Sequence, residues 1–245
     1  MKKLYDKLLL WKSQGKKSLA VLVDPDKTKK LPELLQWAKI SPPDFFLVGG
    51  SFLNNGNLEA CIAEIRSSSE IPIILFPGNA MQISKTADAL LLLSVISGRN
   101  PELLIGAHVS AATTIRESKL EIISTGYILI ESGARTAVNI ATNTEPIPRS
   151  EISLAISTAM AGEQLGMKLI YLEAGSGAQL PVPNEMVKAI REKISTPLIV
   201  GGGLKSKTQI TERCAAGADM IVIGNILEET PGLLPEFSEA VHLFK

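Results

Sequence analysis

Residues 171–177 place one carboxylate beside small side chains, directly after an apolar run. The segment consists of Tyr171, Leu172, Glu173, Ala174, Gly175, Ser176 and Gly177. A carboxylate held at a strand end can accept the proton of a bound hydroxyl group. The same carboxylate could instead be a helix cap or an ion-pair partner. We predict that this segment is an active-site loop in which Glu173 is the general base.

Two glycine-rich segments end apolar runs further along the chain. Gly202 and Gly203 close one of them, and Gly224 and Asn225 close the next. Backbone N–H groups in such turns bind an anion without a charged side chain, and glycine lets a phosphate approach closely. Tight strand-to-helix turns are the alternative for each segment. Because the two segments follow each other at consecutive strand ends, we predict a phosphate-binding site formed by both.

Oxygen-bearing residues also end the first two apolar runs. Asp24 closes the first and Ser51 the second. Hard oxygen ligands suit Mg²⁺, which is usually held in part by waters and substrate phosphates. A solvated turn at Asp24 and a helix cap at Ser51 are the alternatives. Lys27 and Arg99 occupy loop positions where a cation could contact a phosphate group, or could simply be solvated.

Composition narrows the class of protein. The 245 residues are 45% hydrophobic and carry 25 basic and 25 acidic side chains, so the formal net charge is zero. Nothing is basic enough to follow a nucleic-acid backbone, and we expect no nucleic-acid partner. The N-terminal segment lacks the apolar core of a signal peptide, and no apolar stretch reaches the roughly 18 residues of a membrane span. We predict one domain over residues 1–245 in a soluble, cytoplasmic protein.

The cysteines and histidines are too scattered to form a metal cluster. Cys61 and Cys214 lie outside any Cys-x-x-Cys spacing, so we expect two buried structural thiols. His108 and His242 are isolated, and we expect structural roles for both.

Eight short apolar segments end in Gly, Pro, Asp, Asn or Ser and read as strands. They lie at 18–25, 44–51, 71–78, 88–94, 126–132, 168–175, 196–203 and 218–225. Amphipathic helices are predicted between several of them, at 32–40, 58–67, 152–165, 185–194 and 208–216. Strands that are apolar throughout and alternate with helices favour a parallel sheet covered on both faces. We predict a (β/α)8 TIM barrel, whose active site lies at the C-terminal ends of the strands.

The alternation fails after the third strand. About eleven residues separate Phe76 from Asp88, and they begin with a Pro-Gly break. A full crossover helix barely fits, so we predict an irregular or shortened element there. The exposed flank could admit a long apolar ligand. The next connection, 95–125, is long and is predicted to contain a helix.

Seven motifs, in order, resemble those of the geranylgeranylglyceryl phosphate synthase family over nearly the whole chain: LVDPDK, FFLVGGS, LFPGNAMQIS, LLLSVISGRNP, YLEAGSG, IVGGG and VIGN. The resemblance implies a prenyltransferase of ether phospholipid biosynthesis. In that reaction the 3-hydroxyl of sn-glycerol 1-phosphate attacks C1 of geranylgeranyl diphosphate, and diphosphate leaves.

The resemblance also assigns residues to roles. It implies Mg²⁺ as cofactor with Asp24 and Ser51 at the metal, and Glu173 as the base. The glycerol phosphate site would comprise residues 171–177 together with Gly202, Gly203, Gly224 and Asn225. One departure is Leu22, where some members have lysine. This difference points to a second subgroup, in which more of the phosphate binding falls on the glycine backbone.

Three other functions stay open. A heptaprenylglyceryl phosphate synthase would use the same chemistry on a longer prenyl donor. A phosphosugar isomerase or lyase would use Glu173 and Asp24 as an acid/base pair, without a prenyl donor. A phosphate-binding barrel would bind glycerol phosphate without turnover. Family habit further predicts a homo-oligomer, a dimer or hexamer, and the lipid product suggests transient contact with a membrane surface.

Overall fold

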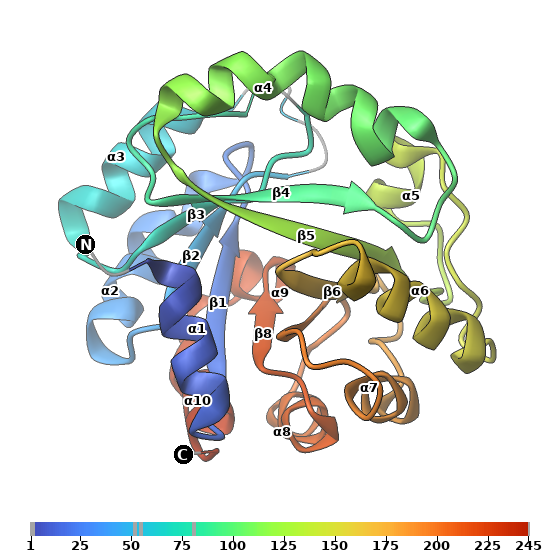
Figure 1. Cartoon of the computed structure of the whole chain (residues 1–245). Helices are drawn as coiled ribbons and strands as arrows, with labels where there is room; N and C mark the ends of the chain where they lie inside the picture. Colours follow the sequence, from blue (N-terminus) through green and yellow to red (C-terminus); the bar gives the residue numbers. More distant parts are fainter. Residues whose placement is uncertain (1–2, 51–52, 54–55, 80–81, 245) are drawn as a thin grey trace.

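The computed structural model describes residues 3–50, 53, 56–79 and 82–244. Its eight parallel strands close into a barrel in sequence order, β1 to β8, with β8 paired to β1 (Figure 1). The predicted TIM barrel is thereby confirmed. The strands are β1 Ser18–Val23, β2 Phe45–Val48, β3 Ile73–Leu75, β4 Ala89–Val95, β5 Glu121–Leu129, β6 Leu169–Glu173, β7 Leu198–Gly201 and β8 Met220–Ile223.

Helices surround the barrel as the sequence predicted, with ends that shift by a few residues. They are α1 Leu4–Ser13, α2 Leu31–Ile40, α3 Leu58–Ser68, α4 Ala107–Ser118, α5 Ala137–Thr142, α6 Ile152–Gln164, α7 Asn184–Arg191, α8 Lys207–Ala216, α9 Asn225–Glu229 and α10 Leu234–His242. The 3₁₀ turns Thr28–Lys30 and Pro231–Leu233 precede α2 and α10, and the π-helical turn Glu102–Gly106 precedes α4. The sequence analysis did not predict α1, α5, α9 or α10. No described helix is long and apolar enough to cross a membrane.

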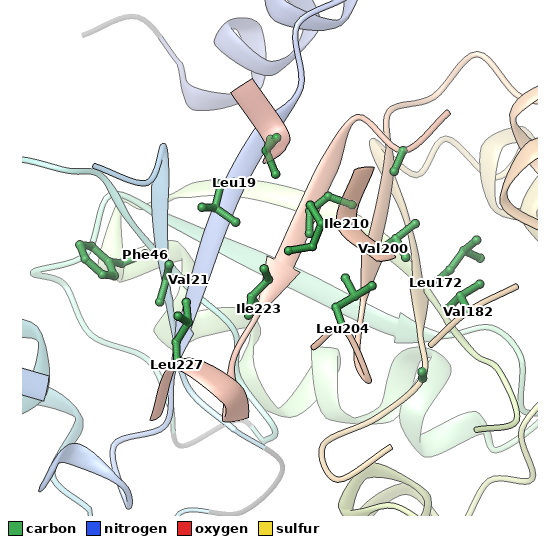
Figure 2. Close-up of a cluster of buried hydrophobic side chains, with 14 of the residues drawn as sticks. Leu19, Val21, Phe46, Leu172, Val182, Val200, Leu204, Ile210, Ile223 and Leu227 are labelled. Atoms are coloured by element: carbon green, nitrogen blue, oxygen red, sulfur yellow. The ribbon is translucent and has the colours of Figure 1, made fainter. Parts of the chain in front are cut away.

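Successive side chains of each strand point alternately outward, under the helices, and inward, into the barrel, so the core has two layers. In β6, Ile170 and Leu172 belong to the outer layer under the helices, whereas Leu169 and Tyr171 belong to the barrel interior. Figure 2 shows the outer layer, with Leu172 near Val182. Fully burying one such aliphatic side chain stabilises the fold by about 1.5–3 kcal/mol. Because both layers are apolar, the strands read as continuous apolar runs in the sequence.

Helix α1 closes the N-terminal end of the barrel. Its Leu4 and Leu8 are buried against the interior layer. The Glu121 carboxylate accepts hydrogen bonds from the backbone N–H groups of Leu4 and Tyr5, at 2.6 and 3.1 Å. An anion at a helix N-terminus satisfies N–H groups that have no partner within the helix.

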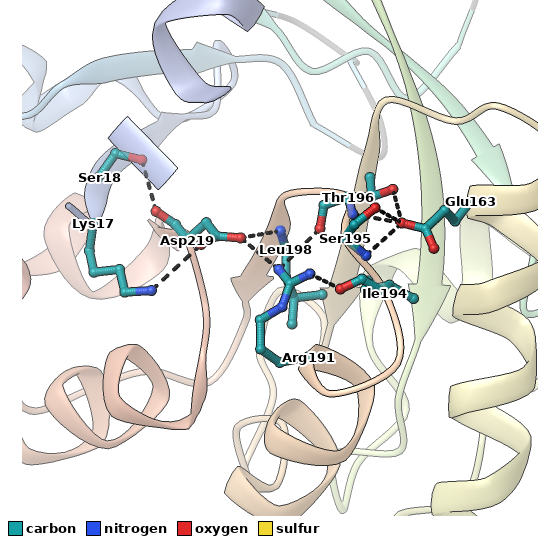
Figure 3. Close-up of polar contacts among 9 residues, drawn as sticks. All are labelled: Lys17, Ser18, Glu163, Arg191, Ile194, Ser195, Thr196, Leu198 and Asp219. Atoms are coloured by element: carbon teal, nitrogen blue, oxygen red, sulfur yellow. Dashed lines mark hydrogen bonds and ion pairs between the residues drawn. The ribbon is translucent and has the colours of Figure 1, made fainter. Parts of the chain in front are cut away.

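Two carboxylates fasten the strands at this same end (Figure 3). Asp219 Oδ2 accepts hydrogen bonds from Arg191 Nη1 and from the backbone of Leu198, both at 2.9 Å, and its Oδ1 lies 3.5 Å from Lys17 Nζ. Glu163 of α6 accepts four bonds through Oε1, from the N–H and the hydroxyl of Ser195 and of Thr196. These contacts fix the segments that lead into β7 and β8.

Burial by itself would raise the pKa of Glu163. The bonds from Thr196 and Ser195 outweigh burial and lower the pKa to about 2. The carboxylate is therefore charged over the whole physiological pH range, and its hydrogen bonds hold α6 to the segment before β7.

The irregular segment after β3 is present as predicted. Among the described residues between β3 and β4, 76–79 and 82–88, none is helical. One prediction of strand position was too short: β5 begins at Glu121 instead of residue 126. Its first half contains Glu121, Ser124 and Thr125, which interrupt the apolar run. The seven pairs from Ala89↔Glu121 to Val95↔Tyr127 nevertheless make β4 and β5 a long ladder.

Candidate active site

A cavity of about 740 Å³ lies at the C-terminal ends of the strands. Ten of the predicted site residues line it: Asp24, Tyr171, Glu173, Gly175, Ser176, Gly177, Gly202, Gly203, Gly224 and Asn225. Leu172 and Ala174 do not, because both side chains belong to the outer layer under the helices. Ser51 lies outside the described residues. The barrel therefore brings together residues from β1, β6, β7 and β8 that are far apart in the chain.

Glu173 is buried at the floor of this cavity, with 6% of its surface exposed. Its Oε1 accepts a 2.6 Å hydrogen bond from the backbone N–H of Gly175. Burial raises the pKa of Glu173, while the Gly175 N–H and the phenols of Tyr171 and Tyr127 act in the opposite direction. A carboxyl group whose pKa is raised is a stronger base than a solvated one, which suits general-base catalysis.

Two tyrosines beside the carboxylate, Tyr127 and Tyr171, form an aromatic cluster with Phe76. The ring centroids of Tyr127 and Tyr171 are 5.2 Å apart, and Phe76 lies 6.0 Å from Tyr127 and 5.7 Å from Tyr171. Burial and the charge of Glu173 raise the pKa of both phenols well above the ordinary value, so both hydroxyls keep their protons. The fully buried Tyr171 hydroxyl meets no hydrogen-bond partner among the described residues.

Left-handed glycines shape the turn after β7. Gly202 and Gly203 have φ of +81° and +69°, which L side chains rarely adopt. A Cβ atom on Gly202 would also collide with Glu173 Oε1 and with the backbone N of Gly175. This turn therefore lies directly against the proposed base, and only glycine fits there.

The turn after β8 leads into the first turn of α9, and Gly224, Asn225 and Ile226 line the cavity. The first N–H groups of a helix have no acceptor within it. The side chain of Asn225 accepts a 3.0 Å hydrogen bond from Ser176 Oγ, which ties this turn to the loop after β6. The two predicted glycine segments and residues 175–177 thus border one space, which is suited to an anion.

Acidic and basic side chains meet at the mouth of the cavity. Lys27 Nζ lies 3.3 Å from Asp24 Oδ2 and 3.2 Å from Glu228 Oε2. Burial alone would lower the pKa of Lys27, but the two carboxylates outweigh it and raise the pKa. Burial raises the pKa of Glu228, and Lys27 partly offsets this effect. The sequence analysis missed Glu228, although its position one helical turn after Asn225 was a usable signal.

The donor set at this mouth fits Mg²⁺ only in part. Among the described residues, no three His, Cys, Asp or Glu side chains are grouped closely enough to hold a metal ion. Mg²⁺ commonly binds through one or two carboxylates and completes its shell with waters and phosphate oxygens. Asp24 fits such a site, whereas an all-protein metal cage is not formed by the residues described.

Of the two predicted cationic contacts, only Lys27 borders the cavity. The guanidinium of Arg99 instead donates to the carbonyls of Ile96 and Gly98 in its own loop, at 2.9 and 2.7 Å. Lys205, which the sequence analysis did not single out, lines the cavity beside the glycine turn after β7.

Gln82 connects the loops after β2 and β3. It is buried, and its Nε2 donates to the carbonyl of Gly50 at 3.1 Å while its Oε1 accepts from the N–H of Gly78, also at 3.1 Å. A Cβ atom on Gly50 would lie 3.4 Å from the carboxylate carbon of Asp24. Gln82 therefore fixes the backbone beside Asp24, a role that no local sequence pattern indicated.

A second, apolar cavity of about 120 Å³ adjoins the first. It lies between β4, the π-helical turn and α4, and its lining includes Leu91, Leu93, Leu103 and Ile115. The two cavities have four lining residues in common: Gly50, Phe76, Tyr127 and Val138. A space bordered by glycine turns and charged side chains thus continues into an apolar one, on the flank where the regular helix pattern breaks.

The histidines and cysteines take no part in the larger cavity. His242 at the opposite end contacts Asp44 and Ser238, at 2.9 and 3.1 Å. His108 Nε2 lies 2.8 Å from the carbonyl oxygen of Leu93 and borders the apolar cavity. Cys61 and Cys214 are buried free thiols, and burial raises the pKa of each to about 12.

Comparison with known proteins gives three findings. The PcrB family matches residues 11–241. Geranylgeranylglyceryl phosphate synthase of Chitinophaga pinensis is 45% identical over 242 residues, and the alignment covers 98% of this chain and 96% of that protein. The synthase of Spirosoma linguale is 48% identical over 236 residues, and the alignment covers 96% of this chain and 95% of that protein. The crystal structure of the Thermoplasma acidophilum synthase in complex with its substrate sn-glycerol-1-phosphate superposes with a TM-score of 0.91, at 29% identity, covering 99% of this chain and 100% of that one.

Proposed function

The chain belongs to the PcrB family, and from that premise we propose that it is a geranylgeranylglyceryl phosphate synthase. It joins the 3-hydroxyl of sn-glycerol 1-phosphate to C1 of geranylgeranyl diphosphate, forming an ether and releasing diphosphate. One observation carries the proposal: a buried carboxylate, Glu173, lies between glycine-lined turns and an apolar cavity. The reaction needs a phosphate site, a base and an apolar site in that order.

The glycerol phosphate binds at the turns after β6, β7 and β8. Backbone N–H groups there, on Gly203 and at the start of α9, can face the phosphate without a charged side chain. Lys205 adds a positive charge at the rim. The glycerol part then extends toward Glu173, whose carboxylate can accept a hydrogen bond from its 3-hydroxyl.

The chemical step uses the two cavities together. The C1–O bond of the allylic diphosphate breaks, and its electron pair leaves on the diphosphate. A lone pair of the glycerol 3-oxygen forms the new C1–O bond, and Glu173 takes the hydroxyl proton. A base positioned in this way contributes roughly 10²- to 10⁴-fold to the rate.

Asp24 is the residue proposed to hold Mg²⁺, with Ser51 as the second predicted ligand. When bound, Mg²⁺ supplies charge neutralisation for the departing diphosphate. Lys27 already lies beside Asp24 and can pair with a diphosphate oxygen. We expect Asp24→Asn to weaken Mg²⁺-dependent binding of inorganic pyrophosphate in calorimetry. An unaltered response to Mg²⁺ would remove Asp24 from the metal site.

The relatives that carry the synthase name favour the C20 donor over the heptaprenyl donor and over a phosphosugar isomerase or lyase. An isomerase would turn over without Mg²⁺ or a donor, and a pure phosphate-binding barrel would consume no donor. Homo-oligomerisation, a cytoplasmic location and transient contact with a membrane surface are retained as proposals. Light scattering and liposome co-sedimentation test the first and the last of these.

The deciding experiment is a donor panel. The purified protein is incubated with sn-glycerol 1-phosphate and prenyl diphosphates from C10 to C35, with Mg²⁺ or with EDTA, and lipid products are identified by mass spectrometry. We expect a Mg²⁺-dependent ether, formed fastest from the C20 donor, and little product from sn-glycerol 3-phosphate. Faster turnover of the C35 donor would make the heptaprenyl alternative correct. The absence of product from every donor would refute the proposed activity.

A further inference from the structure

Phe76, Tyr127 and Tyr171 form an aromatic cluster at the junction of the two cavities. Phe76 and Tyr127 line both spaces, and Tyr171 lines the larger one. The chain contains only 6 Phe, 3 Tyr and 2 Trp residues, yet three of them pack together here, and two of the three, Tyr127 and Tyr171, act on the pKa of Glu173. Their ring centroids are 5.2–6.0 Å apart.

A prenyl diphosphate that reaches both cavities has to pass this junction. Its diphosphate requires the polar mouth at Lys27, and its tail requires the apolar space along β4. The remaining lining residues common to both spaces, Gly50 and Val138, are small or aliphatic. The first isoprene unit, which contains C1, therefore lies against the rings of Phe76 and Tyr127.

Departure of the diphosphate places positive charge on the allyl group of that isoprene unit. As the C1–O bond breaks with its electron pair, the charge is shared between C1 and C3 until the glycerol oxygen bonds to C1 and its proton passes to Glu173. The face of an aromatic ring carries negative charge and attracts a cation within about 6 Å of the ring centre. The attraction is stronger where water is excluded, as at this buried site.

We propose that Phe76 and Tyr127, with Tyr171 behind them, stabilise the developing allyl cation through their π faces and are catalytic residues. An aliphatic side chain would exclude water equally well but would offer no negative face. This inference rests on the proposed prenyl transfer.

Stepwise fluorination of one ring tests the inference with little change in shape. Phe76 is replaced by phenylalanine carrying one, two or three fluorine atoms, each of which withdraws electrons from the ring face. The same series at Phe237, a buried ring of α10 in the outer layer, is the matched control. The single-turnover rate, KM for sn-glycerol 1-phosphate and Tm are measured for every variant.

We expect the single-turnover rate to fall steadily with each fluorine at position 76, by on the order of tenfold over the series, with KM and Tm unchanged. The series at Phe237 should leave the rate unchanged. A flat rate at position 76, in a wild-type protein that makes the ether, would overturn the cation role while leaving the proposed function intact. If the wild-type protein makes no ether from any donor, the proposed function fails and this inference fails with it.

Discussion

The backbone N–H of Gly175 lies 2.6 Å from Oε1 of Glu173, so the loop that follows β6 holds the carboxylate that ends it. The bond is local in sequence but forms at the floor of a cavity built by the whole barrel. It fixes the Oε1 oxygen of the carboxylate in place. This geometry makes Glu173 a more ordered base than a freely rotating side chain would be.

Glu173→Gln tests that role. We expect kcat to fall by at least about 10²-fold, with binding of sn-glycerol 1-phosphate in calorimetry nearly unchanged. Burial raises the pKa of Glu173, so the folded protein holds this proton more tightly than the unfolded chain does. The charged form therefore costs stability above the raised pKa, and Gln should raise Tm at neutral pH. Undiminished turnover would eliminate Glu173 as the base.

The raised pKa of Glu173 also predicts the pH dependence of the reaction. Only the deprotonated carboxylate accepts a proton, so kcat should rise with pH through the raised pKa of Glu173 and then level off. The ascending limb should lie above the range of a solvated carboxyl group and should be absent from the residual rate of Glu173→Gln. An ascending limb that survives the substitution would belong to another group.

Lys27→Met should change two affinities in opposite directions. Its ammonium lies 3.3 Å from Asp24 and opposes a metal ion there, so its removal should tighten binding of Mg²⁺ alone several-fold. Binding of pyrophosphate with Mg²⁺ should weaken about tenfold, because one cationic partner is lost. Lys39→Met on the exposed face of α2 is the control. If both affinities fell, Lys27 would not compete with the metal ion.

Gly202→Ala and Gly166→Ala form a matched pair. Both glycines have φ of +81°, but a Cβ atom would meet nothing within 4 Å at Gly166 and would collide with the Glu173 carboxylate at Gly202. Each substitution should cost about 1–2 kcal/mol of stability from the left-handed backbone. Only Gly202→Ala should also abolish turnover and weaken binding of glycerol phosphate. Equal kinetic effects would mean that the turn after β7 does not border the ligand.

Glu163→Gln tests the hydrogen bonds that connect α6 to the segment before β7. The folded pKa of about 2 lies below the ordinary value of 4.5, so the stabilisation is present above about pH 4.5 and is lost as pH falls toward 2. Because Glu163 is partly exposed and solvent screens its contacts, we expect Gln to lower the free energy of unfolding by only about 1 kcal/mol at pH 7, and the difference should shrink at pH 3. Urea titrations measure this, with Glu236→Gln on the exposed face of α10 as control. A difference independent of pH would point to packing.

The sequence identified most of the barrel because buried parallel strands leave a strong local signal. Runs such as 168–175 and 218–225 are apolar throughout, and a glycine or carboxylate marks their ends. The first half of β5 was not predicted, in part because Glu121 interrupts the apolar pattern. Only the contact of Glu121 with α1 explains why this residue stands there. Backbone pairing with β4 and contact with α1 stabilise this strand, so its sequence does not have to be apolar throughout.

For the site, the sequence by itself determined which residue types stand at the strand ends: Glu173, Asp24 and the glycine turns. Tertiary structure decided how they meet. It placed Gln82 against Gly50, Glu228 against Lys27, and three aromatic rings from separate segments against one another. It also turned Leu172 away from the cavity, because adjacent residues of a strand face opposite sides. Closing a barrel brings the ends of all its strands together, and contacts between residues far apart in the chain leave no mark in any local stretch of sequence.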